Sequence, residues 1–383
     1  MAGIETNARP LMALHLAGER RLFDSDPIVI ADVGARGGFN AEWAAIREAS
    51  RIVCFEPDES ECARLRAKAP PNVTYIPRAL AGKPGPAVLY ETKLAASTGL
   101  YKTAMGYFGR LLNRDNGVVV AERPVEATTL DAALREFGFD AVDFIKLDAE
   151  GAELDILRGG AGVIDASPAL GVLSEVRYQP EINGSPAFGE FDCYLRQIGL
   201  RLYGLRALNQ SRVALPYPGL EDYRLPSGER FFAYTTHGQI QDGDAIYFRD
   251  VLIDANREAF EAASAIKILK LAVLYEIYCL NDCAAELILA ARGKLGSIVD
   301  CERLLDLLAS GIAGRAVRFR DYIDHYFKPD MGGGEAPSLA SLNDRDLEQL
   351  RSELAAVYRS TSWRVTRPLR ALPRLLRRAA AGR

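Results

Sequence analysis

The sequence predicts an α/β fold with a doubly wound sheet, followed by a region built of helices alone. Two observations carry this prediction. Apolar runs and helical patterns alternate through the first eighty residues, and from about residue 251 the helical pattern continues without strands. Alternating strands and helices are typical of a sheet with helices on both faces. At 383 residues, the chain is long enough for one large domain with appendages.

The first three strands and two helices follow one another without interruption. Residues 28–33, "IVIADV", form a β-branched run that predicts a buried parallel strand. Glycines follow this strand. We then expect a helix at 40–50, a strand at 51–57, a helix at 58–68 and a strand at 72–80.

The same kind of pattern continues to about residue 250. Further strands are expected at 87–92, 118–129, 141–148, 169–176, 200–205 and, as the last strand, 230–236. Further helices are expected at 128–138, 150–160 and 188–199. The helix at 150–160 has acids in its first turn and glycines at its end, as the helix dipole and C-cap geometry favour. The alternating elements thus predict one domain over residues 26–250, after an N-terminal extension at 1–25.

The C-terminal third has a different composition. We expect a helical region at 251–328, a linker at 329–338, and a short coiled-coil-like helix with an arginine-rich tail at 339–383. Within 344–358, apolar residues recur with 3-4-3 spacing, so this stretch could join two copies of the chain or pack on the helical region.

The tail at 359–383 holds eight arginines and no acid, interleaved with Trp363 and leucines. Such a mixture can lie on an anionic membrane surface or dock in a complex. The alternative is a disordered basic end. The stretch 360–370, "STSWRVTRPLR", resembles a short motif at the ends of bacterial glycosyltransferases and neighbouring polysaccharide-assembly proteins.

Composition narrows the class of protein. A net charge of −4 gives no basic field for nucleic acid, so we predict no nucleic-acid partner. The six cysteines show no C-x-x-C spacing and the three histidines lie far from paired thiols, so we predict no metal site. The N-terminus has no signal-peptide pattern, and the longest apolar stretch, 265–280, carries Lys267, Lys270 and Glu276. We expect a cytoplasmic protein.

A glycine-rich turn after the first strand is the main candidate ligand site. Asp32 ends the strand beside Gly34, Gly37 and Gly38, a turn that lets a ligand lie against backbone N–H groups. Glu56 ends the second strand, where a carboxylate can bind both hydroxyls of a ribose.

The spacing in this turn favours one of three interpretations. It is G-x-x-G-G, whereas a nicotinamide cofactor prefers G-x-G-x-x-G. An aspartate beside the turn would repel a pyrophosphate but can accept hydrogen bonds from an ammonium group. S-adenosyl-L-methionine has a ribose, an ammonium and no phosphate, so it fits best. A dinucleotide and a purely structural turn remain alternatives.

Four blocks of sequence resemble the FkbM-type family of S-adenosylmethionine-dependent methyltransferases. They are "IADVGARGGFN" (30–40), "VCFEPDE" with "NVTYIPRALAG" after it, the long block 128–160 with "IKLDAEGAELDILRGG", and "GDAIYFR" (243–249). The segment "AASTGLY" (95–101) also matches. The resemblance covers about residues 26–250.

This resemblance implies a Rossmann-like class I methyltransferase sheet with helices on both faces. It also implies methyl transfer from S-adenosyl-L-methionine to a hydroxyl. In the implied cofactor site, Asp32 and Gly34 line the methionine end, Glu56 takes the ribose, and Asp148 faces the transferred methyl. Gly38 and Ser97 are further candidate cofactor-binding residues, and a loop cap is the structural alternative for Ser97. The family usually has Asn where this chain has Arg36, which we expect to point outward or toward an anionic substrate.

A sugar hydroxyl is a poor nucleophile while it is protonated, so we expect a base or a metal near it. The candidate catalytic residues are Asp148, Glu150, Glu175 and His237, all expected near strand ends. The structural alternatives are that Glu150 favours a helix N-terminus, that Glu175 pairs with Arg177, and that His237 is a solvated loop residue.

The sequence therefore predicts an S-adenosylmethionine-dependent O-methyltransferase acting on a glycan or glycolipid precursor, in the cytoplasm or at the inner membrane face. The alternative is a non-catalytic methyltransferase-fold scaffold or binding module in a polysaccharide-assembly complex. A dehydrogenase is the third choice.

Overall fold

The computed structural model describes residues 4–39, 41–220, 223–224, 230–231, 234–253 and 256–327. The chain divides into two compact units, residues 1–318 and 319–383. The second unit is described only by helix α13 (Phe319–Phe327). The linker at 329–338, the apolar stripe at 344–358 and the tail at 359–383 lie outside the described residues, so the expectations for them stay predictions.

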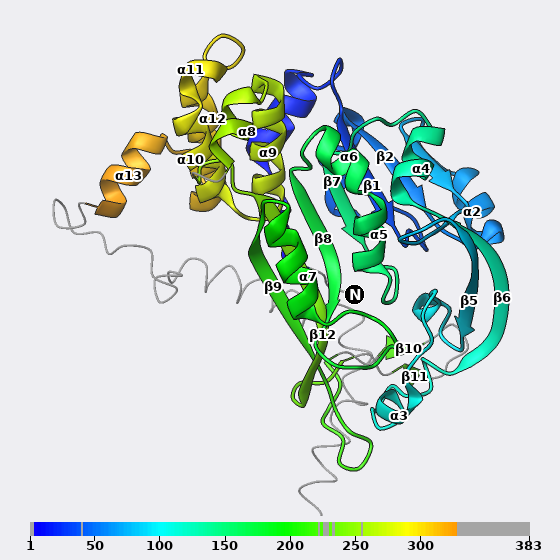
Figure 1. The fold of residues 1–383 in the computed structure, drawn as a ribbon. Coiled ribbons are helices and arrows are strands. Elements are labelled where there is room, and N and C mark those ends of the chain that lie inside the picture. The colour runs from blue at the N-terminus through cyan, green and yellow to red at the C-terminus, as the bar shows by residue number, and fades with distance from the viewer. Residues whose placement is uncertain are drawn as a thin grey trace, which may run out of the picture. The chain divides into compact units, whose positions relative to one another are not determined.

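A seven-stranded sheet forms the centre of the first unit (Figure 1). Its strands are β1 (Ile28–Val33), β2 (Ser50–Phe55), β3 (Val73–Ile76), β7 (Phe144–Leu147), β8 (Gly171–Arg177), β9 (Leu200–Gln210) and β12 (Gln239–Arg249). Their order is β3-β2-β1-β7-β8-β12-β9. Only β12 is antiparallel to its neighbours among these strands. This is the Rossmann-like α/β sheet that the sequence predicts.

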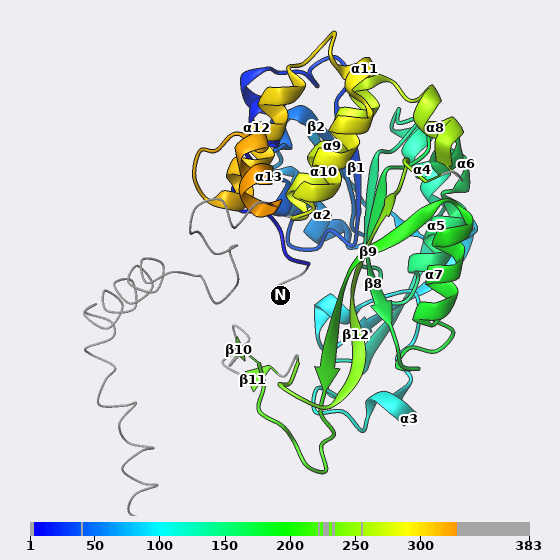
Figure 2. The same ribbon diagram turned by 90° about the vertical axis from the view of Figure 1, so that its left-hand side faces the viewer.

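Helices cover both faces of this sheet (Figure 2). One side carries α4 (Leu130–Glu136), α5 (Glu153–Gly159), α6 (Ala161–Ala166) and α7 (Phe188–Gln197), and the other carries α9 (Ala265–Ile277), α10 (Asn281–Ala290) and α12 (Cys301–Ala313). The other helices of this unit are α1 (Leu11–Leu14), α2 (Glu59–Arg66), α3 (Met105–Phe108), α8 (Arg257–Ala262) and α11 (Arg292–Leu295). None of the helices within the described ranges is long and apolar enough to span a membrane.

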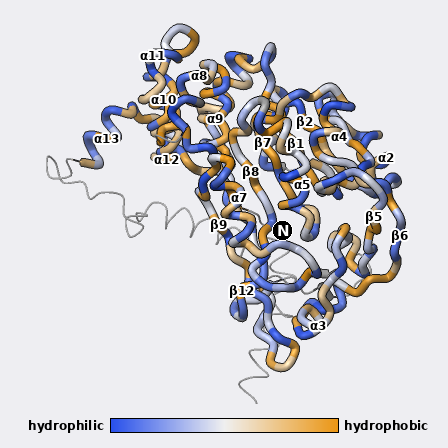
Figure 3. Tube along the Cα trace, in the orientation of Figure 1, coloured by the Kyte–Doolittle hydropathy of each residue, from blue (hydrophilic) through white to orange (hydrophobic). Residues whose placement is uncertain are grey.

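The C-terminal helices pack on the sheet through aromatic and ionic contacts. Figure 3 shows α9 as a mainly hydrophobic helix. The ring of Phe144 in β7 stacks on Tyr278 with 5.4 Å between centroids, and Phe248 in β12 meets Tyr275 at 4.9 Å. Asp143, buried just before β7, binds the ammonium groups of Lys267 at 2.8 Å and Lys270 at 3.0 Å. These contacts hold α9 against the sheet near the amino end of β7.

A second sheet lies beside the first, with the order β4-β6-β5. Its strands are β4 (Ala79–Leu80), β5 (Gly85–Thr92) and β6 (Val119–Thr128). Residues 93–118, between β5 and β6, form an insertion that contains a 3₁₀ turn, η4 (Ala95–Ser97), and helix α3. The third predicted strand, 72–80, is therefore two strands in different sheets. Pro77 separates them, since proline cannot donate to a ladder.

The predicted helix at 40–50 is wrong. Its described part is two 3₁₀ turns, η2 (Ala41–Trp43) and η3 (Arg47–Ala49). Ile46 N–H donates to the Trp43 carbonyl, and Ala49 N–H donates to the Ile46 carbonyl. A three-residue repeat places Trp43 and Ile46 on one side, and both are fully buried.

The predicted last strand at 230–236 is also wrong. Arg230–Phe231 forms a short strand, β11, that pairs with β10 (Tyr223–Arg224) outside the central sheet. Residues 232–233 lie outside the described residues, and the last strand of the sheet is β12.

Candidate active site

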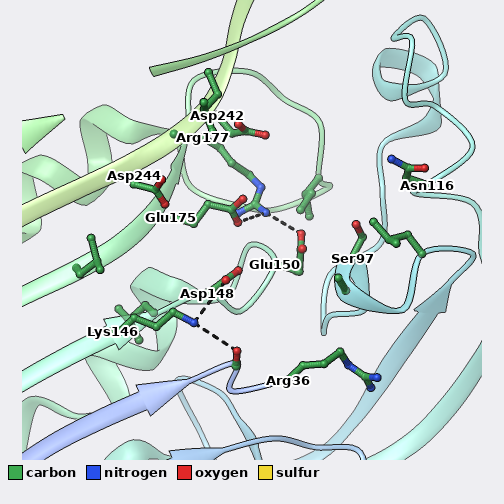
Figure 4. Close-up of a pocket in the computed structure, with 18 of the residues that line it drawn as sticks. Arg36, Ser97, Asn116, Lys146, Asp148, Glu150, Glu175, Arg177, Asp242 and Asp244 are labelled. Atoms are coloured by element: carbon green, nitrogen blue, oxygen red, sulfur yellow. Dashed lines mark hydrogen bonds and ion pairs between the residues drawn. The ribbon is translucent and has the colours of Figure 1, made fainter. Parts of the chain in front are cut away.

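A cavity of about 780 Å³ opens where β1, β7 and β8 end. The strand order changes direction between β1 and β7, and ligands bind at such a switch point in open α/β sheets. Its walls come from the glycine turn after β1, the loop after β7, the ends of β8 and β12, and the insertion at 93–118 (Figure 4).

Gly34 allows the turn after β1 to touch the end of β7. Its φ is +78°, a conformation that favours glycine. A Cβ atom on Gly34 would lie 1.8 Å from the carbonyl oxygen of Asp148. The N–H groups of Gly34 and Ala35 donate to the Phe55 carbonyl, which fixes the turn to β2 as well. Two of the predicted site residues, Gly34 and Asp148, are thus in direct backbone contact.

Lys146 joins the two aspartates of this wall. It stands opposite Asp32 in the β1–β7 register. Its Nζ lies 3.4 Å from Asp32 Oδ1 and 3.4 Å from Asp148 Oδ2 (Figure 4). Burial lowers the pKa of Lys146, but the charges of the two aspartates outweigh it and hold the pKa above its usual range. Lys146 therefore stays charged and positions both carboxylates.

Glu56 lies beside the cavity rather than on its wall. It is buried, and one carboxylate oxygen accepts a hydrogen bond from Asp58 N–H at 2.8 Å. Arg36 Nη2 lies 3.0 Å from Asp58 Oδ2 and 3.6 Å from Glu56 Oε1. We expected Arg36 to point outward or toward an anionic substrate, but it lines the cavity and contacts the two acids at the end of β2. A ribose would reach Glu56 only if Arg36 moved aside.

The insertion at 93–118 forms the opposite wall. Ser97, in η4, lines the cavity, as does Gly38 from the glycine turn. A Cβ atom on Gly99 would lie 2.8 Å from the Cβ of Glu150, so this insertion packs tightly on the loop after β7.

Glu150 and Glu175 meet at one guanidinium nitrogen. Arg177 Nη2 donates to Glu150 Oε2 at 2.8 Å and to Glu175 Oε2 at 2.6 Å (Figure 4). Glu150 comes from the loop after β7, and Glu175 and Arg177 from the end of β8. The two candidate bases, 25 residues apart in sequence, therefore share a single partner.

Two further carboxylates surround the same guanidinium. Glu153 Oε1 lies 3.5 Å from Arg177 Nη1, and Glu181 Oε1 lies 3.3 Å from Arg177 Nε. Glu153 also accepts hydrogen bonds from the N–H groups of Ala149 and Gly151, which fixes the loop that carries Glu150. One positive group thus faces four carboxylates.

This crowding changes the basicity of the glutamates. Burial raises the pKa of Glu150 to about 8, with Arg177 acting in the opposite direction. Burial likewise raises the pKa of Glu175 well above its usual value, and Arg177 again opposes the shift. A carboxylate with a raised pKa is a stronger base than an ordinary one, so either group, in its ionised form, can accept a proton from a hydroxyl.

Carboxylate oxygens of Asp148, Glu150 and Glu175 lie within 4.8 Å of one another, a grouping that could hold a metal ion. Oxygen ligands of this kind suit Mg²⁺ or Ca²⁺. However, Arg177 Nη2 already bonds to both glutamates. The cation that these two residues contact is therefore the guanidinium.

His237 lies outside the cavity wall. It is exposed, its ring lies 5.4 Å from that of Tyr217, and its Nδ1 is 3.2 Å from Thr236 Oγ1. The sequence placed His237 after the last strand, but β12 begins after it, at Gln239. The structure therefore does not bring His237 to the other candidate residues. It does gather Asp32, Gly34, Gly38, Ser97, Asp148, Glu150 and Glu175.

Lys146, Asp242 and Asn113 are among the wall residues that sequence reasoning did not propose, and Arg177 was expected only as a pairing partner of Glu175. Asp242 Oδ1 and Asn113 Oδ1 are buried and have no hydrogen-bond partner within the part of the chain that the structure describes. Burial raises the pKa of Asp242 to about 8, and the charge of Glu181 adds to this. The sequence could have indicated Lys146 and Arg177. Each is a cation that lies within or at the end of an apolar strand, two residues away from a candidate acid.

Comparison with known proteins agrees with this geometry. Residues 32–202 match the family model of the methyltransferase FkbM domain. The chain is also similar to the 2-O-methyltransferase NoeI of Sinorhizobium fredii, with 26% identity over 147 residues. That match covers 35% of this chain and 58% of the relative.

Two solved structures are also similar to part of this chain. One is precorrin-6y C5,15-methyltransferase from Geobacter metallireducens, with 12% identity, 63% of this chain and 87% of that chain covered, and a TM-score of 0.25. The other is the 1,6-didemethyltoxoflavin-N1-methyltransferase of Burkholderia thailandensis, bound to S-adenosylhomocysteine, with 10% identity, 63% and 79% covered, and a TM-score of 0.26. Both TM-scores are too low for these structures to add to what the strand order shows about the fold. The family model thus places a methyltransferase FkbM domain at residues 32–202 of this chain, and the strand order and the cavity at its switch point agree with that match.

Proposed function

We propose that the protein transfers a methyl group from S-adenosyl-L-methionine to a hydroxyl of a sugar in a bacterial glycan or glycolipid precursor. One observation carries this proposal. A single cavity has the glycine turn with Asp32 and Asp148 on one side and the paired bases Glu150 and Glu175 on the other. The matched domain and the similarity to a 2-O-methyltransferase support it.

The cofactor would lie along the glycine turn. This wall presents the carboxylates of Asp32 and Asp148 beside Gly34 and Gly38. Those acids suit a ligand with ammonium and sulfonium charges better than one with a pyrophosphate. Glu56 would bind the ribose hydroxyls once Arg36 leaves its present contacts. When bound there, S-adenosyl-L-methionine supplies an activated methyl group for an oxygen nucleophile.

The acceptor would lie between the insertion and the end of β12. Asp242 Oδ1 and Asn113 Oδ1 line the cavity as buried acceptors without donors among the described residues. Leaving a buried acceptor unsatisfied is costly. A sugar presents several adjacent hydroxyl donors and can satisfy both atoms, which supports a polyhydroxyl acceptor.

Glu150 or Glu175 would then remove the proton from the attacking hydroxyl. Both lie on the cavity wall, and burial raises the pKa of each. The chain's remaining task is to hold this hydroxyl in line with the transferred carbon. The contact with a membrane or an assembly complex through residues 359–383 stays a proposal that rests on the sequence alone.

The test has two stages. Purified protein is titrated with S-adenosylhomocysteine by calorimetry, and Asp32→Asn is compared with the wild type. Radiolabelled S-adenosyl-L-methionine is then incubated with glycan and glycolipid fractions from the source cells, and label in sugar O-methyl groups is measured. Binding without any transfer would favour the alternative of a non-catalytic scaffold. The absence of binding to a folded protein would contradict the cofactor assignment.

A further inference from the structure

We propose that Arg177 is a positioning residue for methyl transfer: it holds the carboxylates of Glu150 and Glu175 together at the cavity wall and keeps them available as bases. This inference rests on the proposed function and adds a residue that the sequence motifs did not single out.

The geometry of the shared nitrogen is the first argument. Glu175 and Arg177 are two residues apart on β8, so both side chains point to the same side of the strand. Glu150 reaches the same nitrogen from the loop after β7, where its φ of +52° is unusual for a residue with a side chain. Because Nη2 donates to one oxygen of each glutamate, it fixes the distance between a group in the loop after β7 and a group on β8.

The other two nitrogens of the guanidinium face carboxylates at ion-pair distance, without a hydrogen bond among the described residues. Glu153 faces Nη1 and Glu181 faces Nε, and the Arg177 side chain is only 4% exposed. Glu181 is itself held by Gln241, which donates to its second oxygen at 2.8 Å. The Arg177 side chain therefore has little freedom to rotate, and its hydrogen bonds restrict the positions of Glu150 and Glu175 as well.

Charge is the second argument. Four carboxylates face one cation, and no other Lys or Arg within the described ranges forms an ion pair with Glu150, Glu175, Glu153 or Glu181. A nearby positive charge favours the ionised form of a carboxylate, typically by about 1–3 pKa units. If this charge is removed, the glutamates hold their protons to higher pH, and the base becomes available only in more alkaline solution.

Two substitutions separate geometry from charge. Arg177→Lys keeps the charge but loses the planar set of donors, so it cannot bind both glutamates in the same way. Arg177→Met removes the charge and keeps much of the apolar volume. We expect kcat to fall about tenfold or more in both variants. In a plot of kcat against pH, we expect the acidic limb to move to higher pH by about one unit or more in Arg177→Met and to stay in place in Arg177→Lys.

Arg249 provides a matched control. It is also a buried arginine at the end of a strand, and its Nε donates to the Ala169 carbonyl at 3.0 Å. It lines a separate hollow of about 420 Å³ and not the candidate active site. Arg249→Lys and Arg249→Met should leave the pH profile unchanged, even where they lower the melting temperature. An equal shift of the profile in the Arg249 variants would overturn the proposal.

A second measurement does not depend on turnover. Glutamate carboxyl groups labelled with ¹³C are titrated by NMR in the wild type and in both Arg177 variants, with Glu150→Gln and Glu175→Gln used for assignment. A higher midpoint for Glu150 or Glu175 in Arg177→Met supports the proposal, and unchanged midpoints overturn it. If Arg177→Met does not fold, the kcat and KM of Arg177→Lys decide. A lower kcat with unchanged S-adenosylhomocysteine affinity supports the positioning role, and a wild-type kcat contradicts it.

This design separates the inference from the function on which it rests. If the wild type transfers no methyl group although the glutamate midpoints respond to Arg177, the proposed function fails while the positioning of the glutamates stands. If the wild type is active and Arg177→Met has a wild-type pH profile, the inference fails alone.

Discussion

Substitution of Gly34 by alanine tests whether the turn after β1 is the cofactor site. The added Cβ would lie 1.8 Å from the carbonyl oxygen of Asp148, whereas real Cβ atoms stay at least 3.0 Å from such a neighbour. Both partners are backbone, so neither can rotate away. The turn and the end of β7 would have to separate by at least about 1.2 Å. Misplacement by about 1 Å can cost a factor of about 100 in function.

We therefore expect Gly34→Ala to weaken S-adenosylhomocysteine binding about 100-fold or to abolish it. Calorimetric titration measures the affinity, and thermal unfolding confirms that the variant folds. Gly138→Ala is the matched control. Gly138 also has a positive φ, +75°, but a Cβ atom added to it would have nothing within 4 Å, and Gly138 does not line the cavity. The control carries only the cost of the left-handed conformation, about 1–2 kcal/mol. Wild-type affinity in Gly34→Ala, or an equal loss in Gly138→Ala, would refute the reasoning.

Three further predictions concern other contacts. Asp143→Asn removes the carboxylate that binds the partly buried Lys267 and the buried Lys270, and Lys270 keeps its ion pair with Asp26, so we expect chemical denaturation to show a loss of about 3 kcal/mol. Burial raises the pKa of Asp143, but the charges of its two lysine partners outweigh burial and lower the pKa below its usual value. The ion pairs therefore stabilise the fold above the ordinary Asp pKa, and this stabilisation is lost as the pH falls through the lowered pKa. Asp143→Asn should flatten this acidic part of a plot of unfolding free energy against pH. Lys146→Met removes the cation between two aspartates, and we expect weaker cofactor binding in calorimetry, with no change arguing against its positioning role. Asp242→Ala should raise the acceptor KM about tenfold with unchanged S-adenosylhomocysteine affinity, and an unchanged KM would remove Asp242 from the acceptor site.

The central sheet was predictable because its strands are short, apolar and separated by clear helices and turns. The "IVIADV" run is β1, and the acids and glycines of residues 150–160 do surround helix α5. The failures also have physical causes. Residues 40–50 have helical spacing, but Trp43 and Ile46 are buried on a three-residue repeat that suits 3₁₀ turns as well.

The candidate site was only partly predictable. Asp32, Gly34 and Asp148 could be placed because each follows a recognisable strand, and strand ends meet at one edge of the sheet. The role of Arg177 could not be predicted, because three of its four partners depend on how the loops after β7 and β8 fold back. Asp242 was hidden for a related reason: it lies in β12, an antiparallel strand that the sequence placed too early.

The most direct test of the central claim is calorimetric titration with S-adenosylhomocysteine, wild type beside Glu56→Ala. The account predicts micromolar-range binding in the wild type and a loss of at least about tenfold, or about 1.4 kcal/mol, in the variant. Absence of binding heat in a well-folded wild type would contradict it, because Arg36 would then keep its contacts with Glu56 and Asp58 and the cavity would not be a cofactor site.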